Sequence, residues 1–273
     1  MAIITFNDIH GVKQTLDTEQ KFNVAFNADC LEILRAMPDN CVDLAVCDPP
    51  YGDALQTEDV EHRNLRGRFA RYDDSSQIGN VERSTPQYNR FGNPGSRFER
   101  YKSEPDRRDM GGEIRKKIIA WDVAPGKEVF AELFRVSRNQ IIWGGNYFEL
   151  PPTRCFLIWR KLSISESFTM AMAEYAWTSF NDNAKVFECA PQGKSSDPRF
   201  HPTQKPIDLY RWIYGLFTEP GQKVFDPFLG SGSSRIAAYE AGLNFVGTEI
   251  DPVYFQKEEE RFERMTDNYS LFD

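Results

Sequence analysis

The stretch Val224-Phe-Asp-Pro-Phe-Leu-Gly-Ser-Gly-Ser-Ser-Arg235 predicts a short strand, a glycine-containing turn and the start of a helix. A helix expected over residues 207–217 precedes it, and a strand over 245–247 and a charged helix over 252–265 follow it. Strands that alternate with helices in this way are typical of an α/β protein with a doubly wound, mostly parallel sheet.

The same alternation continues outward toward the N-terminus. Helices are expected over 31–37 and 127–136, and a further one over 233–241 completes the opening stretch. The sequence therefore predicts one domain over residues 1–273, built on seven strands. They are residues 24–26, 42–47, 140–143, 155–159, 173–177, 224–225 and 245–247.

The composition excludes several classes of protein. The five cysteines are an odd number and include no Cys-x-x-Cys pair, which argues against a disulfide framework and against a zinc site. No apolar run approaches the length of a membrane span, and no basic stretch followed by an apolar segment opens the chain. We therefore expect a cytoplasmic protein that has no contact with a membrane and no secretory leader.

The charge is unevenly distributed. The net charge of −8 alone argues against nucleic-acid binding, but residues 63–117 hold fourteen Lys and Arg against eight Asp and Glu. Residues 53–117 form a polar insertion in which aromatic residues recur among the arginines. We predict that it contacts nucleic acid, the alternative being a solvated insertion without a role. The candidate phosphate contacts are Arg63, Arg66, Arg68 and Arg71.

The glycine turn has the features of a nucleotide site. Gly230 and Gly232 allow the backbone to approach a ligand, and the helix start that follows favours anionic atoms. The dinucleotide fingerprint needs a small residue where Arg235 stands, which argues against NAD. Glu249 lies nineteen residues after Gly230, at the end of the next strand, where it can accept hydrogen bonds from the hydroxyls of a ribose. The alternative is an ordinary turn with an exposed glutamate.

The second candidate site is Asp48-Pro49-Pro50-Tyr51, directly after the apolar stretch 42–47. The prolines remove backbone donors, so the segment offers the Asp48 carboxylate and the Pro49 carbonyl as acceptors. Two acceptors beside an aromatic ring suit the exocyclic amine of a planar base on which Tyr51 stacks. The alternative is a rigid turn. Cys47 lies within the apolar strand, and we assign it to the core rather than to nucleophilic catalysis.

Together, Asp48-Pro-Pro-Tyr51, His201-Pro-Thr-Gln-Lys-Pro206 and the glycine turn resemble the β class of S-adenosylmethionine-dependent DNA adenine-N6 methyltransferases, of phage or solitary bacterial type. The resemblance extends to Trp143-Gly-Gly-Asn-Tyr147 and Glu174-Tyr-Ala-Trp177. It implies a circularly permuted, Rossmann-like fold, S-adenosyl-L-methionine as cofactor, S-adenosylhomocysteine as product, and no metal. The cofactor residues that it implies are Asp29, Asp226, Phe228, Gly230, Gly232, Ser233, Glu249 and Ile250, with His201, Thr203 and Lys205 at the methionine end.

The implied reaction is methylation of the N6 amine of an adenine flipped out of double-stranded DNA. The resemblance also places target recognition between Trp177 and His201, which makes residues 178–200 a second, short recognition segment, and it implies that the nucleic acid contacted by the insertion is DNA. An N4-cytosine enzyme is the main competing interpretation, and Asp48 favours adenine because N4-cytosine members tend to carry Ser there. The sequence also leaves room for an RNA or protein-amide methyltransferase and for a non-enzymatic nucleotide- or DNA-binding module. It leaves open the DNA target sequence, a homodimer and a cognate restriction endonuclease.

Overall fold

The computed structural model describes residues 3–17, 21–52, 122–164, 171–191 and 197–267. Contacts divide the chain into two units. The larger comprises Met1–Tyr51, Ala124–Glu166 and Ala171–Asp273, and it holds every helix and strand discussed below. The smaller comprises Gly52–Val123 and Ser167–Met170, and nearly all of it lies outside the described residues.

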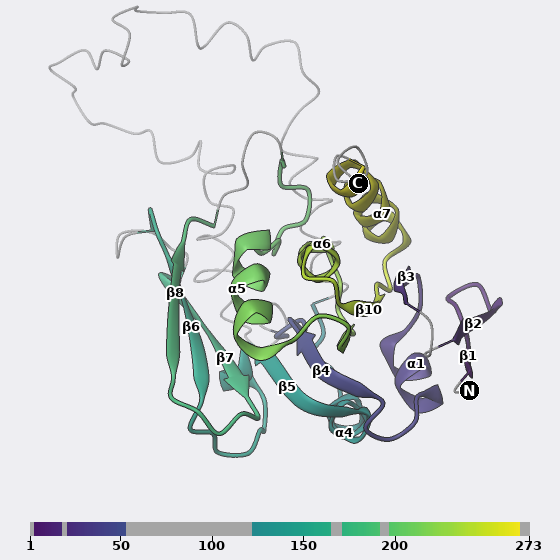
Figure 1. The fold of residues 1–273 in the computed structure, drawn as a ribbon, viewed down its shortest axis with the longest axis horizontal. Helices are drawn as coiled ribbons and strands as arrows, with labels where there is room; N and C mark the ends of the chain where they lie inside the picture. Colours follow the sequence, from purple (N-terminus) through teal and green to yellow (C-terminus); the bar gives the residue numbers. More distant parts are fainter. Residues whose placement is uncertain (1–2, 18–20, 53–121, 165–170, 192–196, 268–273) are drawn as a thin grey trace, which may run out of the picture. The chain divides into compact units, whose positions relative to one another are not determined.

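Within the described residues, one eight-stranded sheet forms the centre of the larger unit (Figure 1). Neighbouring strands are parallel in the first five positions, whereas the sixth strand runs antiparallel to both of its neighbours and the last is parallel to the seventh. The order across the sheet is β3 (Asn23–Phe26), β10 (Asn244–Thr248), β9 (Lys223–Asp226), β4 (Val42–Cys47), β5 (Ser137–Trp143), β7 (Ala173–Thr178), β6 (Phe156–Lys161) and β8 (Lys185–Cys189).

Helices cover both faces of this sheet. Side chains alternate between the faces of a strand. Accordingly Leu44 and Val46 of β4 belong to the core shared with α5 (Ile207–Phe217) and α6 (Ser233–Glu240). Ala45 and Cys47 belong to the opposite core, which contains the buried side chains of α1 (Cys30–Ala36) and α4 (Lys127–Val136). The architecture is therefore the doubly wound α/β fold that the sequence predicts.

The seven predicted strands are all present, but three further strands were not predicted. β8 adds an eighth strand to the sheet, inside the expected recognition segment 178–200. β1 (Ile3–Asn7) and β2 (Lys13–Asp17) form a separate antiparallel hairpin. Each of these strands has five residues; β1 and β2 bury side chains on one face only, and β8 has no fully buried side chain, so the sequence carries a weaker apolar signal there than in β4.

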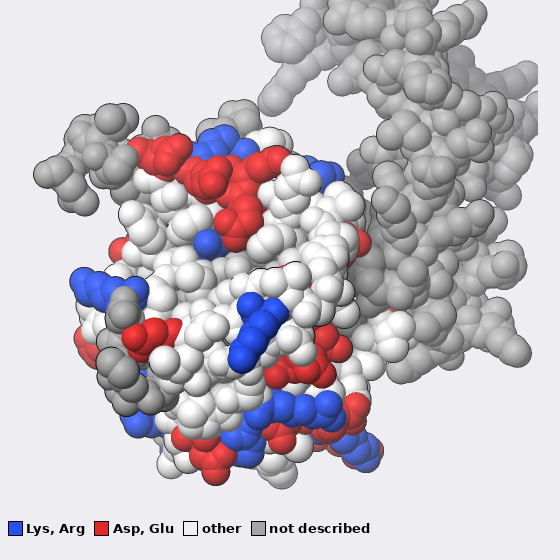
Figure 2. All heavy atoms as spheres, turned by 90° about the vertical axis from the view of Figure 1, so that its right-hand side faces the viewer, with Lys and Arg blue, Asp and Glu red and all other residues white. Residues whose placement is uncertain are grey.

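Among the described residues, the remaining helices are a short 3₁₀ turn, Gly145–Tyr147, and α7 (Pro252–Thr266). Asp251 caps α7 by accepting from the amides of Val253 and Tyr254 at 2.8 and 3.2 Å. Acidic side chains gather at the top of the face in Figure 2, at the height of α7 in Figure 1. No helix among the described residues is both long and apolar enough to cross a bilayer.

Candidate active site

Four loops that carry predicted site residues follow neighbouring parallel strands. These strands are β3, β10, β9 and β4, and their carboxyl ends meet at one edge of the sheet. Two of the loops are joined directly, because the Asn27 amide donates to the carbonyl of Glu249 at 2.7 Å. The topology thus brings together residues that are far apart in the sequence.

The turn after β9 depends on its two glycines. Gly230 and Gly232 have φ values of +54° and +74°, a region that other residues rarely adopt. A Cβ on Gly232 would also overlap Cγ of Glu258 on α7. A Cβ on Gly230 would lie 3.4 Å from the His201 ring, an ordinary van der Waals contact, so it is the positive φ that favours glycine at this position.

Glu249 lies at the end of β10 and faces this turn. Its Oε2 accepts from the amide of Gly230 and its Oε1 from that of Asp251, both at 2.8 Å. Burial raises the pKa of this carboxyl. A carboxylate has about four lone-pair positions, of which these bonds use two. The rest can accept from both hydroxyls of a ribose, so the turn and Glu249 fit an adenosine-containing cofactor.

Asp226 supports the same turn from below. It is 1% exposed, and its two oxygens accept from the Phe228 amide, at 3.0 Å, and from the Ser234 hydroxyl. Burial raises the pKa of Asp226 to about 7. Because both oxygens are used within the protein, the carboxylate holds the turn in shape rather than facing outward.

Asp48 and Tyr51 are joined by a hydrogen bond. The Tyr51 hydroxyl donates to Oδ1 of Asp48 at 2.8 Å, and its ring stacks on Tyr147 at a centroid distance of 4.7 Å. A Cβ on Gly144, whose φ is +65°, would overlap the Tyr51 ring. Gly144 and Tyr147 were not predicted as site residues. Their signal was the pair of glycines that directly follows a predicted strand.

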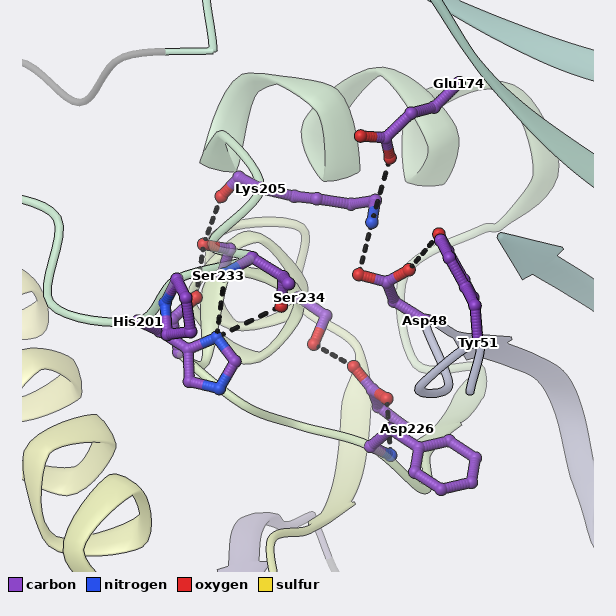
Figure 3. Close-up of polar contacts among 12 residues, drawn as sticks. Asp48, Tyr51, Glu174, His201, Lys205, Asp226, Ser233 and Ser234 are labelled. Atoms are coloured by element: carbon purple, nitrogen blue, oxygen red, sulfur yellow. Dashed lines mark hydrogen bonds and ion pairs between the residues drawn. The ribbon is translucent and has the colours of Figure 1, made fainter. Parts of the chain in front are cut away.

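Lys205 reaches Asp48 from the loop before α5 (Figure 3). Its side chain is 4% exposed, and its ammonium group contacts Oδ2 of Asp48 and lies 3.2 Å from Oε2 of Glu174 on β7. The other oxygen of Glu174 accepts from Lys161 at 2.5 Å. The resemblance assigns Lys205 to the cofactor, but in the structure its ammonium group lies on Asp48, and Glu174 is a neighbour that was not predicted.

The pKa values in this cluster follow from burial and charge. Burial and the Glu174 charge raise the pKa of Asp48, and Lys205 opposes that rise. Burial also favours neutral Glu174, but the ammonium groups of Lys205 and Lys161 lower its pKa to about 2. For Lys205 burial favours the neutral form, and the two carboxylates raise its pKa. Lys205 is therefore a cation held between two acids.

The other predicted cofactor residues lie around the glycine turn. Burial lowers the pKa of His201 to about 4, so its imidazole is neutral, and its Nδ1 lies 3.2 Å from the Thr203 hydroxyl. Ser233 donates to the carbonyl of Lys205 at 2.6 Å, which joins the turn to the loop that carries Lys205. Ile250 is exposed, and so is Asp29, which caps α1 by accepting from the amide of residue 31 at 2.9 Å.

Three further expectations concern Cys47, a metal site and the candidate DNA contacts. Cys47 is fully buried in β4 and burial raises the pKa of its thiol well above the usual value, which agrees with its assignment to the core. No group of three metal-ligating side chains occurs in the part of the chain that the structure describes. The candidate DNA contacts Arg63, Arg66, Arg68 and Arg71 lie outside the described residues.

The chain is similar to several known proteins. A family model described as DNA methylase, of the N6/N4 type, matches residues 128–260. YubD of Escherichia coli (strain K12), which carries the name of a methylase, is 38% identical over 241 residues, covering 85% of this chain and 87% of YubD. The type II methyltransferase M2.MboI of Moraxella bovis is 22% identical and covers 93% of each chain. The structure of the M1.HpyAVI–SAM complex is 18% identical, has a TM-score of 0.45 and covers 87% of this chain and 97% of its own.

Proposed function

Because this chain belongs to the N6/N4 family of DNA methylases, we propose that it transfers a methyl group from S-adenosyl-L-methionine to the N6 amine of a flipped-out adenine in double-stranded DNA. The observation that carries the proposal is the position of Asp48-Pro49-Pro50-Tyr51. It follows β4, and the glycine turn follows β9, the neighbouring parallel strand. A base amine bound at Asp48 would therefore lie beside a cofactor bound at the turn.

The chain's own residues perform two tasks at the base. An aromatic amine is a poor nucleophile, because its lone pair is delocalised into the ring. Hydrogen bonds from the amine to the Asp48 carboxylate and the Pro49 carbonyl favour a pyramidal nitrogen with its lone pair available. The Tyr51 ring, already stacked on Tyr147, offers a surface for the flipped base. Stacking of this kind contributes about 1–3 kcal/mol per base, which offsets part of the cost of flipping.

The cofactor would be held by the glycine turn and by Glu249. The Glu249 carboxylate would accept from the ribose hydroxyls, and the neutral His201 ring covers Gly230. When bound there, S-adenosyl-L-methionine would supply an activated methyl group to the target nitrogen, which would release a proton to water, with S-adenosylhomocysteine as the product.

The choice of adenine over cytosine rests on Asp48. Both bases present an exocyclic amine that needs the same two acceptors, and the family includes enzymes for both. Asp48 favours adenine because Ser is typical of the cytosine-N4 members at that position. The double-stranded DNA partner would contact the basic insertion 53–117, with the segment 178–200 as the second recognition element. The face over α7 is a poor site for DNA, because its acidic side chains repel phosphates (Figure 2).

One experiment tests the proposal. The protein is incubated with unmethylated DNA and S-adenosyl-L-methionine labelled with tritium in the methyl group, the DNA is digested, and the labelled nucleoside is identified. We expect N6-methyladenosine of the deoxy series. Label in N4-methylcytosine would show that the substrate base is cytosine instead of adenine. Label absent from DNA but present in RNA or protein would exclude DNA as the substrate.

A further inference from the structure

Lys205 is the residue whose position is least explained by cofactor binding. The family resemblance assigns its segment to the methionine end of the cofactor. In the structure, however, its ammonium group contacts the carboxylate of Asp48, a residue 157 positions earlier in the sequence. The backbone of Lys205 is held by the hydrogen bond from Ser233, and its charge is held between Asp48 and Glu174. The side chain also passes the Trp143 ring, with Nζ 5.4 Å from its centroid. The whole side chain is therefore fixed toward the target-base half of the site.

We propose that Lys205, held by Glu174, is a positioning residue that orients the Asp48 carboxylate and balances its charge while Asp48 accepts the hydrogen bond of the target amine. This rests on the proposed methyl transfer. Lys205 fixes Oδ2 of Asp48 while the Tyr51 hydroxyl occupies one lone pair of Oδ1. The lone pairs that remain are available to the amine. Lys205 thus acts through Asp48, not on the base itself.

The surrounding charges support this role. The groups that face Asp48 are Lys205, Glu174 of β7, Tyr51 of its own loop, Tyr210 of α5, Asp226 after β9, and Cys47. Of these, only Lys205 is a cation among the described residues. Lys161 contacts the other oxygen of Glu174, so the buried cluster has two cations, Lys205 and Lys161, and two anions, Asp48 and Glu174. Without Lys205, Asp48 and Glu174 would face one another as two buried acids, and one of them would take up a proton.

The experiment is the pH dependence of kcat for methyl transfer in the wild type and in Lys205→Met and Glu174→Gln. Protonation of Asp48 removes its negative charge and takes up one of its acceptor lone pairs, so we expect activity to fall on the acid side of the pH profile. Removing Lys205 takes away the cation that lowers the pKa of Asp48, and we expect the acid limb to move up by about one pH unit or more, a tenfold change in the protonation equilibrium per unit. Removing the Glu174 charge takes away a repulsion that raises the pKa of Asp48, so the acid limb of Glu174→Gln should lie at lower pH than that of the wild type.

Controls separate this role from a structural one. Lys161→Met removes an equally buried lysine from the other oxygen of Glu174, and we expect its limb to stay within a few tenths of a unit. Lys205→Arg retains the positive charge, so its acid limb should lie close to that of the wild type. Asp48→Asn, in which the titrating group is absent, should lose the limb. If Lys205→Met does not fold, Glu174→Gln and Lys205→Arg carry the test.

The outcomes also distinguish the inference from the proposed function. A wild type that transfers no methyl group would overturn the function itself. An active wild type with unmoved limbs in both Lys205→Met and Glu174→Gln would overturn the role of Lys205. Calorimetry measures whether Lys205 also binds the cofactor. We expect the Kd of Lys205→Met for S-adenosyl-L-methionine to lie within about threefold of the wild-type value, whereas an increase of tenfold or more would show that Lys205 binds the cofactor instead.

Discussion

Replacing Asp226 by asparagine removes a buried carboxyl and retains its hydrogen bonds. In the wild type one oxygen accepts from the Phe228 amide and the other from the Ser234 hydroxyl. The asparagine oxygen can accept from Phe228 as before, and its NH₂ group can donate to the Ser234 oxygen after the hydroxyl rotates. The variant therefore imitates the protonated form of Asp226, and the difference between the two proteins reports the cost of its ionisation.

The sign of that difference follows from the pKa. Burial raises the pKa of Asp226 from 3.8 to about 7, so between these values the folded protein holds a proton that the unfolded chain has released. The stabilising contribution is complete below about pH 4 and is lost as the pH rises through 7. A shift of about three pH units corresponds to about 4 kcal/mol, so Asp226→Asn should gain up to that amount relative to the wild type between pH 4 and pH 8.

The assay is urea unfolding of both proteins without cofactor, at half-unit steps from pH 4 to pH 8. Burial also raises the pKa of Glu258 to about 7, and that carboxyl titrates in both proteins, so its contribution cancels in the difference. We expect the difference in unfolding free energy to grow steadily through this range and to level off above pH 7.5. A difference that stays constant, or that shrinks as the pH rises, would refute the assignment of a buried, proton-binding Asp226.

Three further predictions address the cofactor, the base and the DNA. Asp48→Ala should abolish transfer of tritiated methyl groups and leave cofactor affinity nearly intact by calorimetry; more than a few per cent of residual rate contradicts the acceptor role. Glu249→Ala should weaken cofactor binding about ten- to hundredfold, since charged hydrogen bonds contribute about 1.5–3 kcal/mol, and an unchanged Kd removes the basis of the ribose assignment. A quadruple alanine variant of the insertion should bind DNA more weakly, with a salt dependence lowered by about one unit of slope per lost contact; equal slopes would leave the insertion without phosphate contacts. Its substitutions are Arg63→Ala, Arg66→Ala, Arg68→Ala and Arg71→Ala.

Much of the fold could be predicted because its signals are local. β4 is apolar except for Asp43 and is followed by Asp-Pro-Pro, and α4 carries its buried side chains at helical spacing, so each element is recognisable within about ten residues. The short, half-exposed strands β1, β2 and β8 lack such runs. β8 pairs with β6 across more than twenty residues, and a five-residue strand of this kind is defined by its partner more than by its own sequence.

The candidate site divides in the same way. Asp48, Tyr51, Gly230, Gly232 and Glu249 were predicted because proline, glycine and carboxylate side chains at strand ends restrict the backbone and the chemistry within a single loop. Strand order decided that these loops meet at one edge of the sheet.

Only the tertiary structure decided which charges pair. Lys205, in the loop before α5, contacts Asp48 in the loop after β4 and Glu174 on β7. The local sequence around each of these residues does not indicate which residues it contacts. Electrostatic interaction depends on distance in space and on the exclusion of water, and both are properties of the packed sheet and its helices. The sequence by itself therefore determined where the proposed acceptor for a base amine stands, and the fold determined that a buried lysine lies against it.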